Sequence, residues 1–170
     1  PGRVITGLVA SEALGPVLMV GQAYAFEVPA FAVDRNDCPL GTPTTFQFTV
    51  GHADVTPPNP SEWTLNGPTA GTREPLDVGL GTAHDHLSLA FRLRVIDADG
   101  ELVPGRIDLG AAEANWIFTP HLPWTARPYT LNVEETLEDL AGNRPGVLFD
   151  RPAVQSAIPW QDKLRFTPRS

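Results

Sequence analysis

Short segments in which apolar and polar residues alternate recur along this chain, and they constrain its fold more than any other feature. The pattern occurs at residues 22–28, 45–50, 87–95 and 129–133. Side chains of a strand point alternately to opposite faces, so each segment predicts a strand with one buried face. The 170 residues include 18 Pro and 15 Gly, which disfavour long helices. The sequence predicts an all-β, antiparallel sandwich or barrel, with residues 133–140 as a single helical turn or a loop.

A strand and the acidic turn that follows it occur twice, at an offset of 105 residues. Tyr24 and Asp34 of the first copy correspond to Tyr129 and Asp139 of the second. A fixed internal spacing is typical of repeated domains. We therefore expect Tyr24 and Tyr129 to occupy equivalent core positions. We expect Asp34 and Asp139 to shape equivalent turns.

The repeat predicts how the chain is divided. Residues 1–53 correspond to the C-terminal half of a β-sandwich domain, and residues 57–150 to a complete one. Between them, residues 54–60 form a linker in which three of the last four residues are Pro. Half a sandwich exposes the inner face of its sheet and an unpaired edge. We expect these to be covered by upstream sequence, by the tail at 151–170 acting as a complementing strand, or by another chain.

Two shorter similarities support this arrangement. Residues 1–4 (Pro-Gly-Arg-Val) match residues 104–107 (Pro-Gly-Arg-Ile) at nearly the same offset. In the tail, residues 164–168 (Leu-Arg-Phe-Thr-Pro) resemble residues 116–120 (Trp-Ile-Phe-Thr-Pro). The tail therefore has the sequence of a strand.

From residue 54 to residue 150 the order of motifs resembles the bacterial Ig-like domain first described in S-layer proteins. That family occurs as tandem modules of secreted bacterial proteins. The resemblance implies an Ig-like β-sandwich, neighbouring Ig-like domains as partners, and an extracellular or cell-surface location. The segments that carry it are Asp-Val-Thr-Pro-Pro at 54–58, the hairpin at 95–105, Ile-Phe-Thr-Pro at 117–120, Tyr-Thr-Leu-Asn-Val at 129–133 and Leu-Glu-Asp-Leu-Ala-Gly-Asn at 137–143.

Charge and composition disfavour several partners. The formal net charge is -8, without a local basic cluster, so a phosphate backbone would be repelled. No apolar run approaches the roughly 18–20 residues that span a bilayer. Cys38 is the only cysteine, which rules out an internal disulfide and leaves the role of this thiol open. We predict binding neither to nucleic acid nor within a membrane.

Two acidic or histidine-containing clusters are weak candidates for metal sites. His84 and His86, two apart, would share one face of a strand, but a zinc site needs at least three protein ligands. We expect them to be exposed histidines beside a turn. Asp97 and Asp99 precede Gly100 and resemble part of a calcium loop, yet Asp-Gly is also the usual tight-hairpin pair. We expect a hairpin here.

The turn at Asp139 and Asn143 raises the same question about calcium. A side-chain-capped turn is the simpler interpretation. Calcium between two domains would need oxygen ligands from both, with Asp54 as the linker's contributor. The sequence therefore predicts no resident cofactor, with calcium as the alternative.

Catalytic motifs are missing from the sequence, and its tryptophans allow a second interpretation. No Ser lies in a Gly-x-Ser-x-Gly motif, and no phosphate-binding Gly-rich loop or His-Glu-x-x-His motif occurs. We predict that the chain is not an enzyme. Trp63, Trp116, Trp124 and Trp160 could form a sugar-stacking platform if two or more were exposed on one face. Trp116 lies in an apolar strand, whereas Trp124 and Trp160 follow prolines in loops and could be exposed. We favour packing, because large apolar side chains contribute most where they are buried.

These observations lead to three hypotheses about function. The first is a non-catalytic structural, adhesion or spacer module of a secreted or cell-surface bacterial multidomain protein. The second is an accessory carbohydrate- or calcium-binding module of a secreted hydrolase. The third is a subunit of a surface filament assembled by strand exchange.

Overall fold

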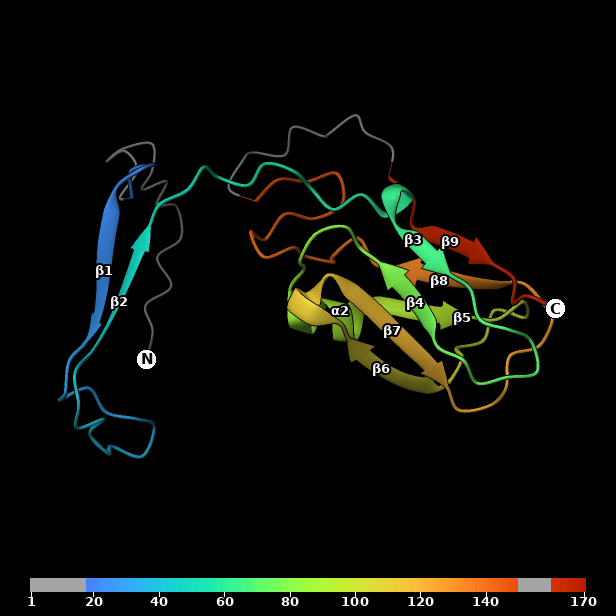
Figure 1. Ribbon diagram of the computed structural model, residues 1–170, viewed down its shortest axis with the longest axis horizontal. Helices are drawn as coiled ribbons and strands as arrows, with labels where there is room; N and C mark the ends of the chain where they lie inside the picture. Colours follow the sequence, from blue (N-terminus) through green and yellow to red (C-terminus); the bar gives the residue numbers. More distant parts are fainter. Residues whose placement is uncertain (1–17, 150–159) are drawn as a thin grey trace. The chain divides into compact units, whose positions relative to one another are not determined.

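The computed structural model describes residues 18–149 and 160–170, and the chain divides into two compact units (Figure 1). The first unit is Pro1–Ala53 and the second is Asp54–Ser170. Residues 1–4, which match residues 104–107 in sequence, lie outside the described residues. The division falls at the start of the Pro-rich segment.

Two antiparallel sheets form the second unit. One has the strand order β3-β4-β7-β6 and the other β5-β8-β9. Within residues 54–149 and 160–170, one α-helix and two 3-10 helices lie in the connections. The elements are η1 (Pro60–Glu62), β3 (Thr64–Asn66), β4 (Leu76–Gly79), α2 (His86–Arg92), β5 (Leu93–Ile96), β6 (Gly105–Leu109), η2 (Ala111–Glu113), β7 (Asn115–Pro120), β8 (Tyr129–Val133) and β9 (Lys163–Phe166).

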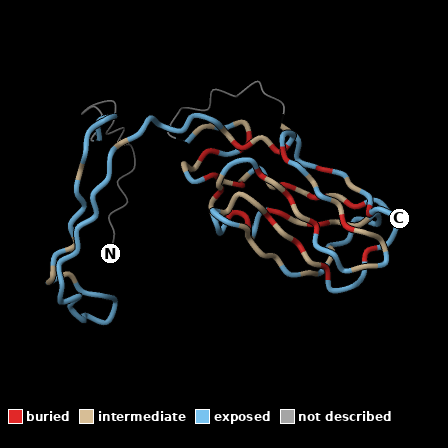
Figure 2. Tube along the Cα trace, in the orientation of Figure 1, coloured by how far each residue is buried: buried red, intermediate tan, exposed pale blue. Residues whose placement is uncertain are grey.

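The two sheets share one apolar core. Every second residue of β4, β7 and β8 is buried, so alternation in the sequence becomes alternation between core and surface. Trp116 of β7 and Leu131 of β8 belong to the same buried cluster. Burying a side chain of this size contributes about 1.5–3 kcal/mol. The all-β prediction is confirmed, and the second unit is a sandwich-like pair of sheets. Its buried positions are drawn in red in Figure 2.

Residues 87–95 do not form the single strand that their alternation predicts. Asp85 caps the N-terminus of α2 by accepting a hydrogen bond from the Ser88 backbone N–H at 2.8 Å. This cap and the helix-forming residues that follow it favour a helix, and the strand begins only at Leu93. Within α2, Leu89 packs in the core, whereas Leu87 and Phe91 are exposed. After β8 ends at Val133 the chain forms a loop with a turn at Glu135–Thr136, which is the loop alternative considered for residues 133–140.

The tail belongs to the second unit. Strand β9 pairs antiparallel with β8, and Leu164 is buried in the shared core. The compact domain therefore extends to Ser170 instead of ending near residue 150, and among the described residues β9 pairs with β8 and not with β1 or β2. The physical reason is that β8 pairs with β5 along one edge and would otherwise leave its other edge unpaired. Residues 151–159 of the tail lie outside the described residues.

The described part of the first unit is a two-stranded hairpin with its loops. Strands β1 (Ala23–Val28) and β2 (Thr44–Thr49) pair antiparallel. The register places Tyr24 opposite Phe48 and Phe26 opposite Phe46, so the four aromatic rings share one face. Most positions of this hairpin are exposed, as the pale blue trace in Figure 2 shows. Tyr24 is only half-buried among the described residues.

Candidate functional site

The acidic turn of the second unit is the centre of a buried polar network. One carboxylate oxygen of Asp139 accepts hydrogen bonds from the backbone N–H groups of Ala141 (2.8 Å) and Asn143 (2.9 Å). Its other oxygen accepts from the Asn143 side-chain amide at 3.0 Å. Gly142 completes the turn at a φ of 80°, a conformation that glycine adopts without strain. Asp139 and Asn143 thus act together, as their spacing predicts.

Asn143 connects this turn to a distant part of the chain, at Asp54, and to the residues that follow the turn, at Phe149. Its Nδ2 donates to the carbonyl oxygen of Asp54 at 3.2 Å, and its Oδ1 accepts from the backbone N–H of Phe149 at 3.0 Å. Asp54 is the first residue of the second unit. Because Asn143 is almost fully buried, these hydrogen bonds replace ones that water would otherwise make. The network therefore fixes the incoming segment on the domain.

The same loop geometry occurs at Asp34 and at Asp97. Asp34 Oδ1 accepts from the backbone N–H groups two and four residues later, at 2.7 and 3.0 Å, and these hydrogen bonds hold the pKa of this carboxyl below its ordinary value. Asp97 Oδ1 does the same at 2.9 and 2.9 Å. The residue three positions after each Asp has a positive φ, as in three-residue hairpin loops. One oxygen of each carboxylate is thus occupied by its own loop.

Asp99 makes an ion pair instead of lying beside Asp97 as a second ligand. Arg127 donates to both Asp99 oxygens, at 2.8 and 2.9 Å. These hydrogen bonds and the guanidinium charge hold the pKa of Asp99 below its ordinary value. The hairpin expected at Asp97 and Gly100 is present, since Gly100 donates to the Asp97 carbonyl.

The two histidines are separated, and the expectation that both are exposed is wrong. His84 is fully buried, and its ring meets that of Trp63 edge-on at 5.7 Å. Its Nδ1 lies 2.9 Å from the Thr82 carbonyl oxygen and donates to it, while Nε2 has no hydrogen-bond partner among the described residues. Burial lowers the pKa of this imidazole. The burial of His84 could not be inferred from its local sequence, because it depends on residues distant in the chain, such as Trp63.

His86 lies on α2, exposed, with Nδ1 3.3 Å from a carboxylate oxygen of Glu113. The two imidazoles therefore do not share the strand face that their spacing would give them in an extended chain. Among residues 18–149 and 160–170, no three His, Cys, Asp or Glu side chains are grouped as a metal site requires.

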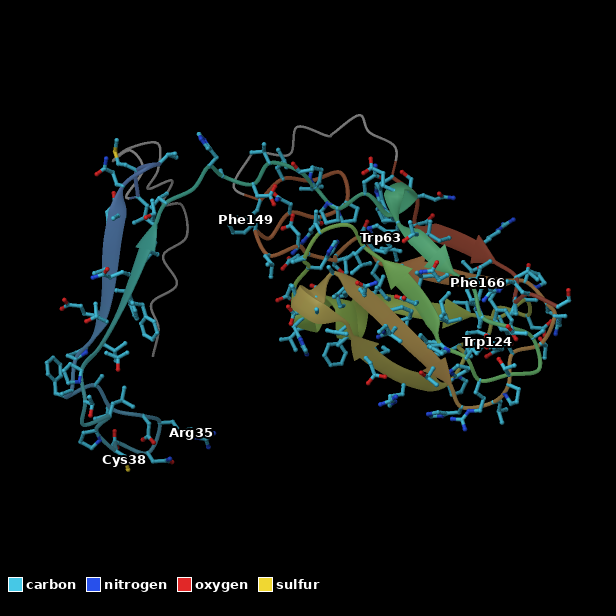
Figure 3. All side chains as sticks on the ribbon, viewed as in Figure 1. Arg35, Cys38, Trp63, Trp124, Phe149 and Phe166 are labelled. Carbon is cyan, nitrogen blue, oxygen red and sulfur yellow. The ribbon has the colours of Figure 1, made fainter. Side chains whose placement is uncertain are left out.

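The tryptophans are mainly core residues. Trp63, Trp116 and Trp124 are buried, so the alternative of an exposed Trp124 is wrong. The indole N–H of Trp124 donates to the Glu74 carbonyl oxygen at 2.7 Å, and its ring packs against Phe166, both labelled in Figure 3. Trp160 is partly exposed and lines a pocket of about 370 Å³.

Sequence reasoning missed the equivalence of two hairpins. Tyr24 stacks on Phe48 with ring centroids 6.0 Å apart, and Tyr129 stacks on Phe166 at 5.7 Å. The signal was available, because Phe-Gln-Phe-Thr at 46–49 matches Leu-Arg-Phe-Thr at 164–167. The two strand connections differ in length, which hides this match from a search at one fixed offset.

A contact between the β3–β4 connection and the C-terminal residues of the second unit was also missed. Thr69 and Arg169 form a parallel bridge, in which the Ala70 N–H donates to the Arg169 carbonyl at 2.7 Å. In return, the Arg169 N–H donates to the Pro68 carbonyl at 2.8 Å. Backbone groups make these bonds, so residue types give no signal for them.

A scan against protein-family models finds no match, and searches of curated proteins and of solved structures find none either. In the described part of the chain, no helix has both the length and the apolar character to cross a bilayer. The function is therefore inferred from the chain's own residues.

Proposed function

We propose that the chain is a non-catalytic spacer, made of Ig-like sandwich domains, in a secreted or cell-surface bacterial multidomain protein. The second unit is one such domain, and the first unit contains the last two strands of a preceding copy. The observation that carries the proposal is the parallel bridge between Pro68–Ala70 and Arg169.

Parallel pairing of an early segment with the C-terminal residues of the domain would give resistance to tension. The segment at Pro68–Ala70 follows β3, the first strand of the second unit, and Arg169 lies next to the C-terminal residue. A force that pulls the two ends of the domain apart acts in opposite directions along these two parallel segments. Both hydrogen bonds are then loaded in shear at the same time and must break together. A spacer needs this property because tension reaches it through its two ends.

The incoming segment is held by side chains as well. Asn143, whose position is determined by Asp139, bonds the Asp54 carbonyl oxygen, and Asp54 Oδ1 accepts from the Thr56 N–H at 2.9 Å. The prolines that follow restrict the backbone further. Because Asp54 is bonded to the folded domain, a force that enters at Asp54 acts on the domain without first detaching the residues that follow Asp54.

The tyrosines support the Ig-like assignment. The hydroxyl oxygen of Tyr129 accepts from the backbone N–H of Thr125 at 3.1 Å, and that of Tyr24 accepts from Met19 at 3.0 Å. A tyrosine near a strand start that bonds the backbone a few residues upstream is a recurrent corner of Ig-like sandwiches. Both units have this corner, which favours tandem copies of one domain type.

Single-molecule pulling tests the proposal. The full chain is stretched through its ends, and the Arg169→Pro variant, which lacks the N–H that bonds Pro68, is compared with Arg169→Ala, which retains it. We expect one main unfolding event that releases about 400 Å, from an extended length of roughly 3.5 Å per residue over 54–170. The Pro variant should unfold at a lower force, and the Ala variant at the original force. Equal forces for all three proteins would refute the spacer proposal.

One observation favours the alternative of a carbohydrate-binding module. The pocket of about 370 Å³ brings Trp160 together with Asn59 and Glu62, an indole beside amide and carboxylate groups that hydrogen-bond hydroxyls. Titration with soluble glycans, followed by tryptophan fluorescence in the original chain and in Trp160→Ala, tests it. A change that is lost in the variant would support binding, and no change across a broad glycan panel would exclude this module.

A further inference from the structure

We propose that the aromatic face of the β1–β2 hairpin is one half of a domain core. It docks on the inner face of a β-sheet of the β3-β4-β7-β6 type, supplied by polypeptide N-terminal to β1. This inference rests on the proposed tandem arrangement and names the partner of the first unit. The hairpin face is defined by Tyr24, Phe26, Phe46 and Phe48.

The hairpin is apolar on one face only. Phe26, Phe46 and Phe48 are 59%, 57% and 42% exposed. The residues between them in each strand point to the opposite face and are small or polar: Ala23, Ala25 and Glu27 in β1, and Thr45, Gln47 and Thr49 in β2. An isolated hairpin is at best marginally stable in water, and a contiguous aromatic patch of this kind marks an interaction surface.

The β8–β9 hairpin of the second unit shows what this face is built to contact. Tyr24 and Phe48 correspond to Tyr129 and Phe166, with the same cross-strand pairing and nearly parallel rings, at 24° and 21°. The next pair inward is Phe26 with Phe46 in the first unit. In the second unit it is Leu131 with Leu164, which are 0% and 8% exposed. The faces therefore correspond pair by pair.

The cover of the second hairpin defines the chemistry of the partner. Trp124 packs edge-on against Tyr129 at 5.0 Å and against Phe166 at 5.7 Å. Phe118 of β7 lies 6.0 Å from Trp124 and stacks on Trp116 at 5.7 Å. The partner of the first hairpin thus presents aromatic side chains both from a strand equivalent to β7 and from the connection that follows this strand.

Chain order in the second unit identifies the source of that sheet. All four strands of β3-β4-β7-β6 precede β8 in the sequence, and so does β5, which pairs with the other edge of β8. Within the described residues β1 pairs only with β2, so its other edge is open to an equivalent of β5. Because the first unit repeats this order, both the facing sheet and the edge strand come from polypeptide that precedes β1. A second copy of the hairpin would supply neither.

The experiment supplies the missing sheet from this protein itself. A chimera carries residues 54–128 directly before Tyr24, in place of residues 1–23, and keeps residues 24–170 unchanged. Hydrogen exchange is then measured at the backbone amides of β1 and β2 in the chimera and in the original chain. We expect near-unprotected exchange in the original chain and exchange at least about 100-fold slower in the chimera, as for buried strands.

Two control variants locate the effect on the face. In the chimera, Phe26→Ser with Phe46→Ser should abolish the new protection, whereas Ala25→Ser with Gln47→Ser on the opposite face should leave it. In the original chain the first pair should reduce the fluorescence of a hydrophobic dye without changing the thermal midpoint of the second unit. This measurement does not depend on folding of the chimera.

Three results would overturn the inference. One is protection of β1 and β2 in a monomer of the original chain, which would mean that its own residues cover the face. Another is a dimer in light scattering that the Phe26→Ser, Phe46→Ser pair dissociates, which would make a second copy the occupant. The third is a chimera whose hairpin stays unprotected, since residues 54–128 cover the equivalent hairpin in the second unit. The pulling experiment concerns the second unit alone, so either proposal can fail without the other.

Discussion

The β1–β2 hairpin and the β8–β9 hairpin have the same cross-strand register and the same Tyr–Phe stack, yet the pair of side chains next to that stack is exposed in the first hairpin and buried in the second. In the second unit the face is covered by Trp124 and β7, and in the first unit it is open among the described residues. The difference teaches that alternation determines which side chains share a face. Only a facing sheet determines whether that face contributes to stability.

The prediction with the largest expected effect compares Trp124, which covers the β8–β9 face, with the residue at the matched position of the first unit. Trp124 lies five residues before Tyr129, and Met19 lies five residues before Tyr24. We expect Trp124→Ala to destabilise the second unit by about 3–5 kcal/mol, because it leaves a large cavity in the core. Met19→Ala, at an exposed position, should change stability by less than about 0.5 kcal/mol.

Urea unfolding followed by circular dichroism measures both changes. A small effect of Trp124→Ala would contradict the description of this residue as the cover of the β8–β9 face.

The acidic loops provide the second test. Asp139→Ala leaves the buried Asn143 amide and backbone N–H without their acceptor, at a cost of about 1–3 kcal/mol for a buried donor. Asp34→Ala removes the same kind of hydrogen bonds from an exposed loop, where water replaces them. We expect a clear fall in the thermal midpoint of the second unit for Asp139→Ala only. Equal midpoints for the two variants would show that burial of the loop does not matter.

His84 makes the stability of the second unit depend on pH. Its folded pKa is lowered by burial, so between this pKa and the unfolded value of about 6.5 the unfolded chain binds more protons. Stability is therefore complete above about pH 6.5 and falls as the pH drops toward the folded pKa. Urea midpoints between pH 7.5 and pH 5 measure the fall, roughly the range in which histidine titrates.

The matched variants are His84→Asn, which keeps a donor for the Thr82 carbonyl but does not titrate, and His86→Asn on the exposed helix. We expect the first to flatten the pH dependence in this range and the second to leave it. An unchanged profile in His84→Asn would assign the dependence to other groups.

The smallest effect concerns Arg127, whose counterpart in the first unit is Gln22 at the offset of 105. Arg127→Gln makes the second unit resemble the first. Because the ion pair with Asp99 is exposed and screened by salt, we expect almost no change in the thermal midpoint. The pKa of Asp99 should rise toward its ordinary value, which an NMR titration measures. A pKa that stays low would mean that another group causes the shift.

Parts of the candidate site were predictable because they depend on local chemistry. The Asp139 turn with Asn143 follows from residue type and spacing, since an Asp side chain bonds backbone N–H groups two and four residues later. Burial of His84 and Trp124 was not predictable, because both depend on strands distant in sequence. The helix at 86–92 was missed because Leu87, Leu89 and Phe91 alternate as in a strand, whereas Asp85 acts as a helix cap.

By itself the sequence determined the strands near residues 23–28, 44–49 and 129–133, the Pro-rich boundary at residue 54 and the three acidic loops, because each depends on contacts within a few residues. Tertiary structure alone decided that β9 joins β8, that Arg169 pairs with the segment at 68–70, and that one of two equivalent aromatic faces is covered. Those outcomes depend on backbone hydrogen bonds and packing between residues far apart in the chain, and such contacts leave no local pattern in the sequence.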